Sequence, residues 1–183
     1  MTTLLPFLIQ LMGLRDPHAE RHADHVAELA LKLGKVLGLK TDELELLHVA
    51  ASIHDIGKMA INEFVINKPG HFTEAEYIMV QQHAQIGASL VKTLDIDPSI
   101  HSIILNHHEN FDGTGYPHGE KGDEIPLGAR IIRIADTYDA LTSNRGYRAA
   151  YSHKKSLEIM ERDAQFFDPT LLDLFFKNVA RKH

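Results

Sequence analysis

The stretch Ala50-Ala51-Ser52-Ile53-His54-Asp55-Ile56-Gly57-Lys58 is an apolar run that ends in three ionisable side chains and a glycine. Burying ionisable groups is costly unless they are paired, hydrogen-bonded or bound to metal. A His54-Asp55 pair at the end of a core helix therefore requires partners from elsewhere in the chain. Gly57 is predicted to end that helix.

The composition fits a single globular domain. The 183 residues are 44% hydrophobic and 24% charged, which are ordinary values for a chain that buries its own core. The net charge of −6 argues against binding to DNA or RNA polymers. The absence of cysteine suits a cytoplasmic protein and excludes thiolate ligands, so metal ligands would come from carboxylates and the 13 histidines.

The apolar N-terminal segment, residues 4–12, lacks a basic leader and is interrupted by Pro6 and Gln10. It is a poor secretion signal and too short to span a bilayer, so we expect no membrane insertion. We expect residues 1–14 to form a helix that packs on the core or makes a homodimer interface. The main domain is then residues 15–183.

Hydrophobic periodicity predicts helices along the whole chain and no confident strand. Local signals place their ends, such as Thr73 followed by Glu76, and Asp97 followed by Pro98. Residues 110–122 contain four glycines and a proline and are predicted to form a long loop. The fold is therefore predicted to be all-α, with helices over residues 17–37, 41–56, 62–66, 73–94, 98–108, 127–141, 153–165 and 169–180.

Seven ionisable residues interrupt the predicted apolar helices at their ends or inner faces. They are His22, His54, Asp55, His83, His107, His108 and Asp136. One helical histidine is more often a core or surface residue than a ligand, but seven such residues are hard to explain that way. Adjacent helical residues do not share a face, so His107 and His108 would reach two neighbouring ions and would not chelate one. Asp55 is the candidate bridge between those ions.

Imidazole and carboxylate ligands without thiolate suit iron, manganese, zinc or nickel, and we favour iron or manganese. His18 lies four residues before His22, shares its helical face and is a candidate extra metal ligand. A partly exposed histidine near a helix N-terminus is an equal alternative for His18. The sequence thus predicts two or three divalent metal ions.

The order of these motifs resembles the HD-GYP family, a branch of the HD-domain metal-dependent phosphohydrolases. The resemblance extends from Arg15 to about Leu172. It rests on His22, His54-Asp55-Ile56-Gly57-Lys58, residues 83–87, His107-His108-Glu109, residues 113–117 and Ala135-Asp136. It implies an HD-domain helical bundle that hydrolyses cyclic di-GMP to linear pGpG, or onward to GMP, by a metal-bridging hydroxide. By matching position the seven residues above are the metal ligands, whereas trinuclear members have glutamate where this chain has His18.

The family's phosphate-contacting residues match Lys58, Arg145 and Arg148. An acidic protein needs local cations to hold a doubly charged dinucleotide; arginine binds phosphate bidentately, and lysine acts as a point charge. Arg145 and Arg148 as ordinary loop cations are the alternative. Lys58 and Asp55 are the candidate catalytic residues, with either Lys58 or a metal-bound water protonating the leaving oxygen.

The Gly115-Tyr116-Pro117 loop has two interpretations. In the first, Tyr116 stacks on a guanine of the substrate. In the second, the loop docks a partner protein, which the resemblance connects with cyclase domains of the GGDEF type.

Two other functions stay open. One is hydrolysis of another cyclic dinucleotide or nucleotide phosphate ester, because the base-contacting groups are not readable from the sequence. The other is a catalytically weak module that binds the nucleotide or docks a cyclase. Missing ligands would favour that second function, and none is missing.

Overall fold

The computed structural model of the chain describes residues 4–15, 19–68, 70–144 and 149–180. Within these ranges every regular element is helical, which confirms the all-α prediction. The α-helices are α1 (Leu4–Arg15), α2 (Ala19–Val36), α3 (Thr41–Ile53), α4 (Glu63–Ile66), α5 (Glu74–Lys92), α6 (Pro98–Asn106), α7 (Leu127–Thr142), α8 (His153–Arg162) and α9 (Pro169–Leu174). Shorter 3₁₀ turns span Ile56–Ala60, Gly122–Glu124 and Ala164–Phe166, and a π-helical turn spans Phe175–Val179.

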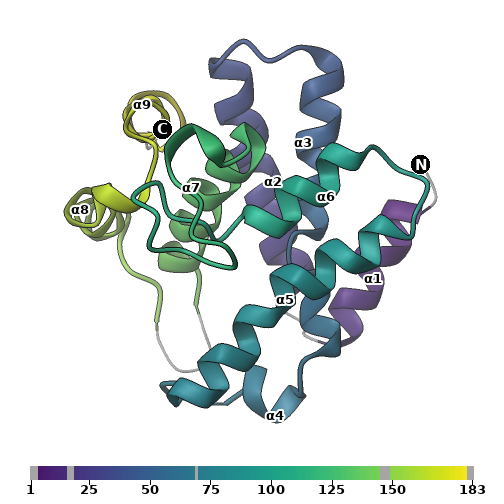
Figure 1. Cartoon of the computed structure of the whole chain (residues 1–183). Coiled ribbons are helices and arrows are strands. Elements are labelled where there is room, and N and C mark those ends of the chain that lie inside the picture. Colours follow the sequence, from purple (N-terminus) through teal and green to yellow (C-terminus); the bar gives the residue numbers. More distant parts are fainter. Residues whose placement is uncertain (1–3, 16–18, 69, 145–148, 181–183) are drawn as a thin grey trace.

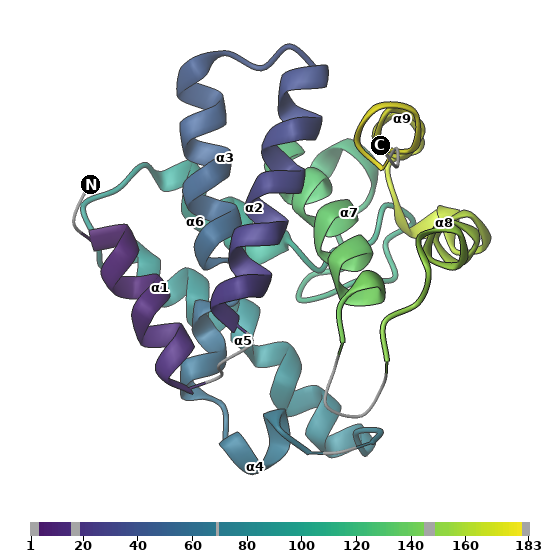
Figure 2. The same cartoon turned by 180° about the vertical axis from the view of Figure 1, so that it is seen from behind.

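Helices α2 and α3 run side by side in the middle of the molecule (Figures 1 and 2). Helix α2 also packs on α7, and α6 packs on both α3 and α5. Helices α8 and α9 lie beyond α7 on one side, while α1 lies on the opposite side. The core between them is aliphatic; Ile131, Ile132 and Ile134 of α7, for example, are fully buried.

The predicted cap at the start of α5 is present. The Thr73 hydroxyl accepts a hydrogen bond from the Glu76 backbone N–H, and the Glu76 carboxylate accepts one from the Thr73 N–H at 2.7 Å. Asp97 caps α6 in the same local manner, with Pro98 in its first turn. These side chains satisfy N–H groups that lack partners within the helix, so the two helix starts are fixed locally.

The prediction that Gly57 ends α3 is wrong. Helix α3 ends at Ile53, and Gly57 lies inside the following 3₁₀ turn without a positive φ. Gly57 lies directly against α5: a Cβ there would overlap the carbonyl oxygen of His83 and lie 2.5 Å from the amide nitrogen of Gly87. Glycine is needed at this position for close approach of two backbones.

Between α6 and the turn at Gly122, residues 107–121 contain turns and bends but no helix. Gly113 and Gly119 have positive φ values of 85° and 73°, which glycine adopts without strain. Gly115 packs against the chain that leaves α6, and a Cβ there would lie 2.5 Å from the carbonyl oxygen of His108. The loop is thereby held next to His108.

Helix α1 packs on α2 and α3 through its buried Met12, while Phe7 and Leu14 are exposed. This accounts for packing on the core; a homodimer interface stays a prediction. None of the helices in the described part of the chain is both long and apolar enough to cross a membrane.

Candidate metal centre

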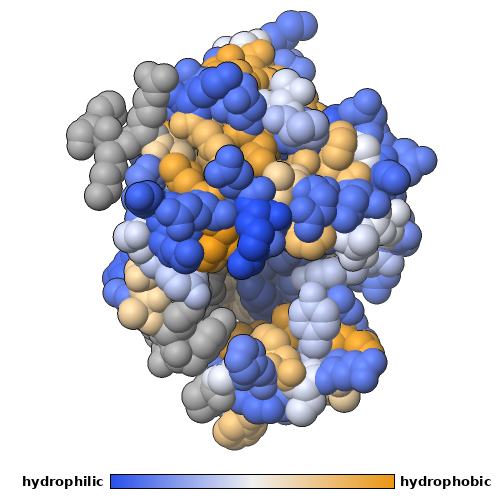
Figure 3. Space-filling view, turned by 90° about the vertical axis from the view of Figure 1, so that its left-hand side faces the viewer, coloured by the Kyte–Doolittle hydropathy of each residue, from blue (hydrophilic) through white to orange (hydrophobic). Residues whose placement is uncertain are grey.

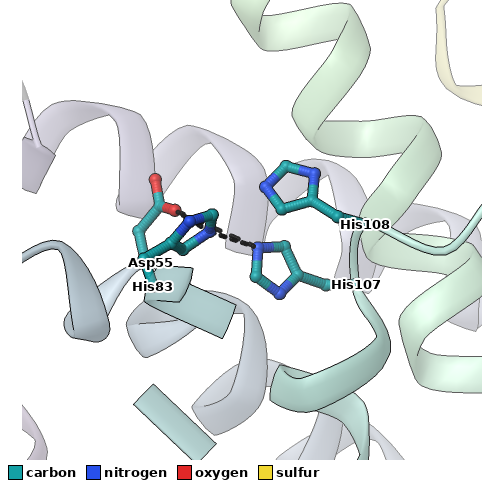
Figure 4. Close-up of side chains that lie close together, drawn as sticks. All are labelled: Asp55, His83, His107 and His108. Atoms are coloured by element: carbon teal, nitrogen blue, oxygen red, sulfur yellow. Dashed lines mark hydrogen bonds and ion pairs between the residues drawn. The ribbon is translucent and has the colours of Figure 1, made fainter. Parts of the chain in front are cut away.

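Five segments of the chain bring the seven predicted side chains together. They form two groups, and the ligand-type atoms within each group lie within 4.8 Å of one another. The first group is Asp55, His83, His107 and His108, and the second is His22, His54 and Asp136. The prediction that His107 and His108 reach two different ions is therefore wrong: α6 ends at Asn106, so the two residues are not adjacent positions inside a helix, and their ring centroids lie 4.1 Å apart in one group. Figure 4 shows the first group, with the His83 ring between the Asp55 carboxylate and the His107 ring.

Asp55 lies between the two groups, with one carboxylate oxygen facing each. Its Oδ1 is 3.3 Å from Nε2 of His83 and 4.0 Å from Nε2 of His107. Its Oδ2 is 3.5 Å from Nε2 of His54 and 3.7 Å from Nε2 of His22. This is the placement expected of a carboxylate that bridges two metal ions.

Three of the histidines are oriented by their own helices. In each case the Nδ1–H donates to the carbonyl oxygen three residues earlier, so Nε2 is the nitrogen that faces the centre. A histidine that ligates metal through one nitrogen commonly donates the other N–H to a fixed acceptor in this way. The pairs are His54 with Ala51 (2.7 Å), His83 with Val80 (2.6 Å) and His107 with Ile104 (2.6 Å).

His22 is oriented by a carboxylate instead. Its Nδ1 lies 2.6 Å from Oδ2 of Asp139, while its Nε2 lies 3.2 Å from Oδ1 of Asp136. The other Asp139 oxygen is 3.2 Å from Nδ1 of His25 and accepts a hydrogen bond from the Ser143 hydroxyl at 3.1 Å. Asp139 was not predicted as a site residue, although it shares a helical face with Asp136 three residues earlier.

The carboxylates of the centre are held in their charged form. Burial opposes ionisation, but the charges of Lys58 and His54 keep the pKa of Asp55 well below its usual range. Burial is likewise outweighed at Asp136, where the hydrogen bond with His22 keeps the pKa of the carboxyl well below its usual range. The centre therefore presents negative charge to a cation.

The histidines differ in their protonation. Burial, with the neighbouring imidazoles, lowers the pKa of His107 and of His108 well below the usual value, and burial also lowers the pKa of His83. For His22 burial acts in the same direction, but the hydrogen bonds with Asp136 and Asp139 raise its pKa to about 9. The first group thus holds neutral imidazoles, the form that binds metal.

The residues present fit a bound divalent metal. Among the described residues, His54 Nε2 and Asp55 Oδ1 are buried polar atoms without a hydrogen-bond partner. Burying such atoms without a partner is costly, and both atoms point to the centre, where a bound cation would replace the missing hydrogen bonds. Nitrogen and oxygen donors without sulfur suit a first-row divalent ion.

The predicted substrate-binding residues are only partly described. Lys58 lies at the centre, with its Nζ 2.5 Å from Oδ2 of Asp55. The Tyr116 ring stacks on the ring of His108, with centroids 4.8 Å apart and planes at 28°. Outside the described residues lie His18, Arg145 and Arg148.

Glu109 is a second residue whose role was not predicted from the sequence. Its buried carboxylate accepts hydrogen bonds from the backbone N–H groups of His118, at 2.7 Å, and Gly119, at 3.1 Å. It therefore fastens the glycine-rich loop to the end of α6, beside His108. The sequence signal was its place directly after His107-His108.

Residues 6–171 match the family described as HD domain. The chain therefore belongs to the HD-domain family, which implies binding of divalent metal. Its motif order and its curated relatives identify it further as a member of the HD-GYP branch, as the sequence predicted. The match begins inside α1.

Two curated relatives are similar over most of this chain. The cyclic di-GMP phosphodiesterase response regulator RpfG of Xanthomonas campestris is 34% identical over 177 residues, covering 95% of this chain and 47% of RpfG. The 3'3'-cGAMP-specific phosphodiesterase 3 of Vibrio cholerae is 37% identical over 154 residues, covering 84% of this chain and 34% of that protein. The chain thus spans about half or less of the length of these relatives.

Among solved structures, the fold is similar to the HD domain of the L. monocytogenes phosphodiesterase PgpH in complex with cyclic di-AMP. The TM-score is 0.68 at 20% identity, over 94% of this chain and 93% of that one. At this identity the likeness supports the fold alone.

Proposed function

We propose that this chain is a metal-dependent phosphodiesterase that hydrolyses cyclic di-GMP to linear pGpG, or onward to GMP. The observation that carries the proposal is the position of Asp55 between two groups of donor atoms, which is the layout of a two-metal phosphoester hydrolase. The name of RpfG, a cyclic di-GMP phosphodiesterase, supports the choice of substrate.

In this proposal the first group would hold one divalent ion, and His22, His54 and Asp136 would hold a second, with an Asp55 oxygen facing each group. Iron or manganese suits these donors, and His18 is retained as the candidate ligand of a third ion. When bound, such ions activate water and stabilise charge on the phosphate. The buried imidazoles and carboxylates of this chain fix where that chemistry takes place.

Lys58 supplies the positive charge closest to the bridging carboxylate. Its side chain is 34% exposed, so the ammonium group can reach both Asp55 and a phosphate at the centre. There it offsets charge on the phosphate oxygens or gives a proton to the leaving oxygen. In the proposal Arg145 and Arg148 bind the second phosphate, because guanidinium groups match phosphate geometry.

The loop residues Gly115-Tyr116-Pro117 retain a second proposed role, docking a GGDEF-type cyclase domain. The position of the loop supports this role, because Glu109 and Gly115 fix it next to His108 at the centre. Tyr116 covers one face of the His108 ring, so the loop also contacts the centre directly.

A second candidate substrate is 3'3'-cGAMP, because a Vibrio cholerae relative that is 37% identical is named for it. A substrate panel separates the two. Protein purified without air and loaded with manganese or iron is incubated with cyclic di-GMP, 3'3'-cGAMP and cyclic di-AMP, and products are resolved by chromatography. We expect cyclic di-GMP to be cut fastest and a chelator to stop the reaction. Faster cleavage of 3'3'-cGAMP would select the second candidate, and no cleavage of any member would contradict both.

Asp139→Asn is expected to weaken metal binding at the second group by roughly 10- to 100-fold, the usual effect of losing the hydrogen-bond partner of a ligating histidine. Asparagine keeps the size of Asp139 but loses the charge that fixes the Nδ1–H of His22. Calorimetric titration with Mn²⁺ measures the change. Ser143→Ala is the matched control, because Ser143 contacts the other Asp139 oxygen. Equal affinities of Asp139→Asn and the control would contradict the assignment.

A further inference from the structure

The start of α5 exposes an unusual run of large side chains beside the metal centre. Tyr77, Ile78 and Met79 are 49%, 52% and 48% exposed, and Phe64 of the neighbouring α4 is 82% exposed. Figure 3 shows a hollow across the middle of this face, with hydrophobic residues on the lower side, where α4 and the start of α5 lie. The core does not need these side chains, so their exposure calls for another explanation.

Aromatic rings connect this surface with the centre. The Tyr116 ring stacks on His108, and the edge contact between Tyr116 and Tyr77 has centroids 6.4 Å apart at 82°. One face of Tyr116 is therefore already covered by an imidazole, and burial raises the pKa of its hydroxyl. Tyr77, half exposed, is the more exposed aromatic residue of the pair, whereas Tyr116 is only partly exposed.

We propose that Tyr77 is the stacking residue for a nucleobase of the cyclic dinucleotide, an assignment that rests on the proposed function. In a nucleotide the base stands one sugar away from the phosphate. The rings of His108, Tyr116 and Tyr77 lead outward from the first donor group, so a base attached to a phosphate at the centre would meet Tyr77 as the outermost of these rings. Aromatic faces hold bases by stacking that tolerates differences in sequence.

The side chains around Tyr77 also explain why Tyr77, and neither of the two residues after it, would stack on a nucleobase. Ile78 and Met79 are as exposed as Tyr77 but have no aromatic face. Tyr77 is held from one side by Tyr116, so little rotamer freedom is lost when a base packs on it. Tyr116 would then form the inner wall of the same subsite.

The test compares Tyr77→Ala, Tyr77→Phe and the matched control Ile78→Ala, which lies in the same turn of α5. Each variant is assayed with cyclic di-GMP and with methyl p-nitrophenyl phosphate, a phosphodiester without a nucleobase. For Tyr77→Ala we expect the ratio of the two kcat/KM values to fall about 10- to 100-fold, mainly through KM for cyclic di-GMP. Tyr77→Phe keeps the ring and should stay within about twofold of wild type, as should Ile78→Ala. Metal content per chain, measured by mass spectrometry, should not change in any variant.

The possible failures are distinguishable. If wild type cuts cyclic di-GMP and Tyr77→Ala keeps the same substrate ratio, the stacking assignment is overturned while the proposed function stands; the surface would then suit a protein partner. If the ratio falls equally in Ile78→Ala, the effect comes from the shape of α5 and the assignment is again overturned. If wild type leaves every cyclic dinucleotide intact, both the function and the assignment fail.

Discussion

Asp55→Ala is expected to purify with little or no metal and to lose hydrolysis of cyclic di-GMP by at least about 10³-fold. The two carboxylate oxygens of Asp55 face different donor groups, so this one substitution removes a candidate ligand atom from both groups. Losing a single charge-stabilising group in an active site costs about 10²- to 10³-fold, and loss of the bridge removes more than one such group. Metal content by mass spectrometry and the rate of pGpG formation measure the two effects.

Two controls make the Asp55 result decisive. Asp173→Ala removes an exposed carboxylate of α9, which pairs with Lys177 away from the centre, and should keep both metal and activity. Asp55→Asn preserves the volume of the buried side chain, so a folded, metal-poor and inactive Asp55→Asn would show that the loss is not a packing effect. An Asp55→Ala protein that retains full metal content would contradict the bridging role.

Gly57→Ala is expected to destabilise the fold by about 3 kcal/mol or more, at the upper end of the cost of forcing extra atoms into a packed site. The added Cβ would overlap the backbone of His83, and a backbone in the middle of α5 cannot move aside as a flexible side chain can. Movement of α5 would also displace the His83 imidazole from Asp55, so metal affinity should fall together with stability.

Urea denaturation measures the effect of Gly57→Ala, with Gly13→Ala as the matched control. Gly13 lies inside α1, and its nearest neighbour to an added Cβ is the flexible Glu20 side chain at 3.3 Å. Alanine in a helix interior is more stabilising than glycine by roughly 0.5–1 kcal/mol, so the free energy of unfolding of the control should be unchanged or slightly higher. An unchanged urea midpoint for Gly57→Ala would contradict the close contact between the two backbones.

The helices were predictable because their ends are encoded locally. The side chains of Thr73 and Glu76 each accept a hydrogen bond from the backbone N–H of the other residue, and the spacing of the two residues is visible in the sequence alone. The histidines and aspartates of the centre were predictable for a different reason: each is an ionisable group where an apolar residue would be expected. Such groups have to find partners, so their convergence follows from the cost of burying them.

Contacts between segments were not predictable from local patterns. Glycine commonly ends helices, but the role of Gly57 depends on its distance to α5, which no local pattern contains. Asp139 binds His22 of α2, which lies 117 residues away, and Glu109 binds backbone N–H groups nine and ten residues later, across the glycine-rich loop. The exposure of Tyr77 and its contact with Tyr116 likewise depend on how α5 packs against the loop, which the local sequence does not contain.

In the proposed function, two donor groups joined by Asp55 form one hydrolytic centre for cyclic di-GMP. The most direct measurement is a titration of metal-free protein with Mn²⁺ without air, in which bound metal and pGpG formation are followed together. We predict that cleavage appears as the second ion per chain binds, because both groups are needed at the phosphate. Protein that binds two ions per chain and leaves cyclic di-GMP intact would contradict the account.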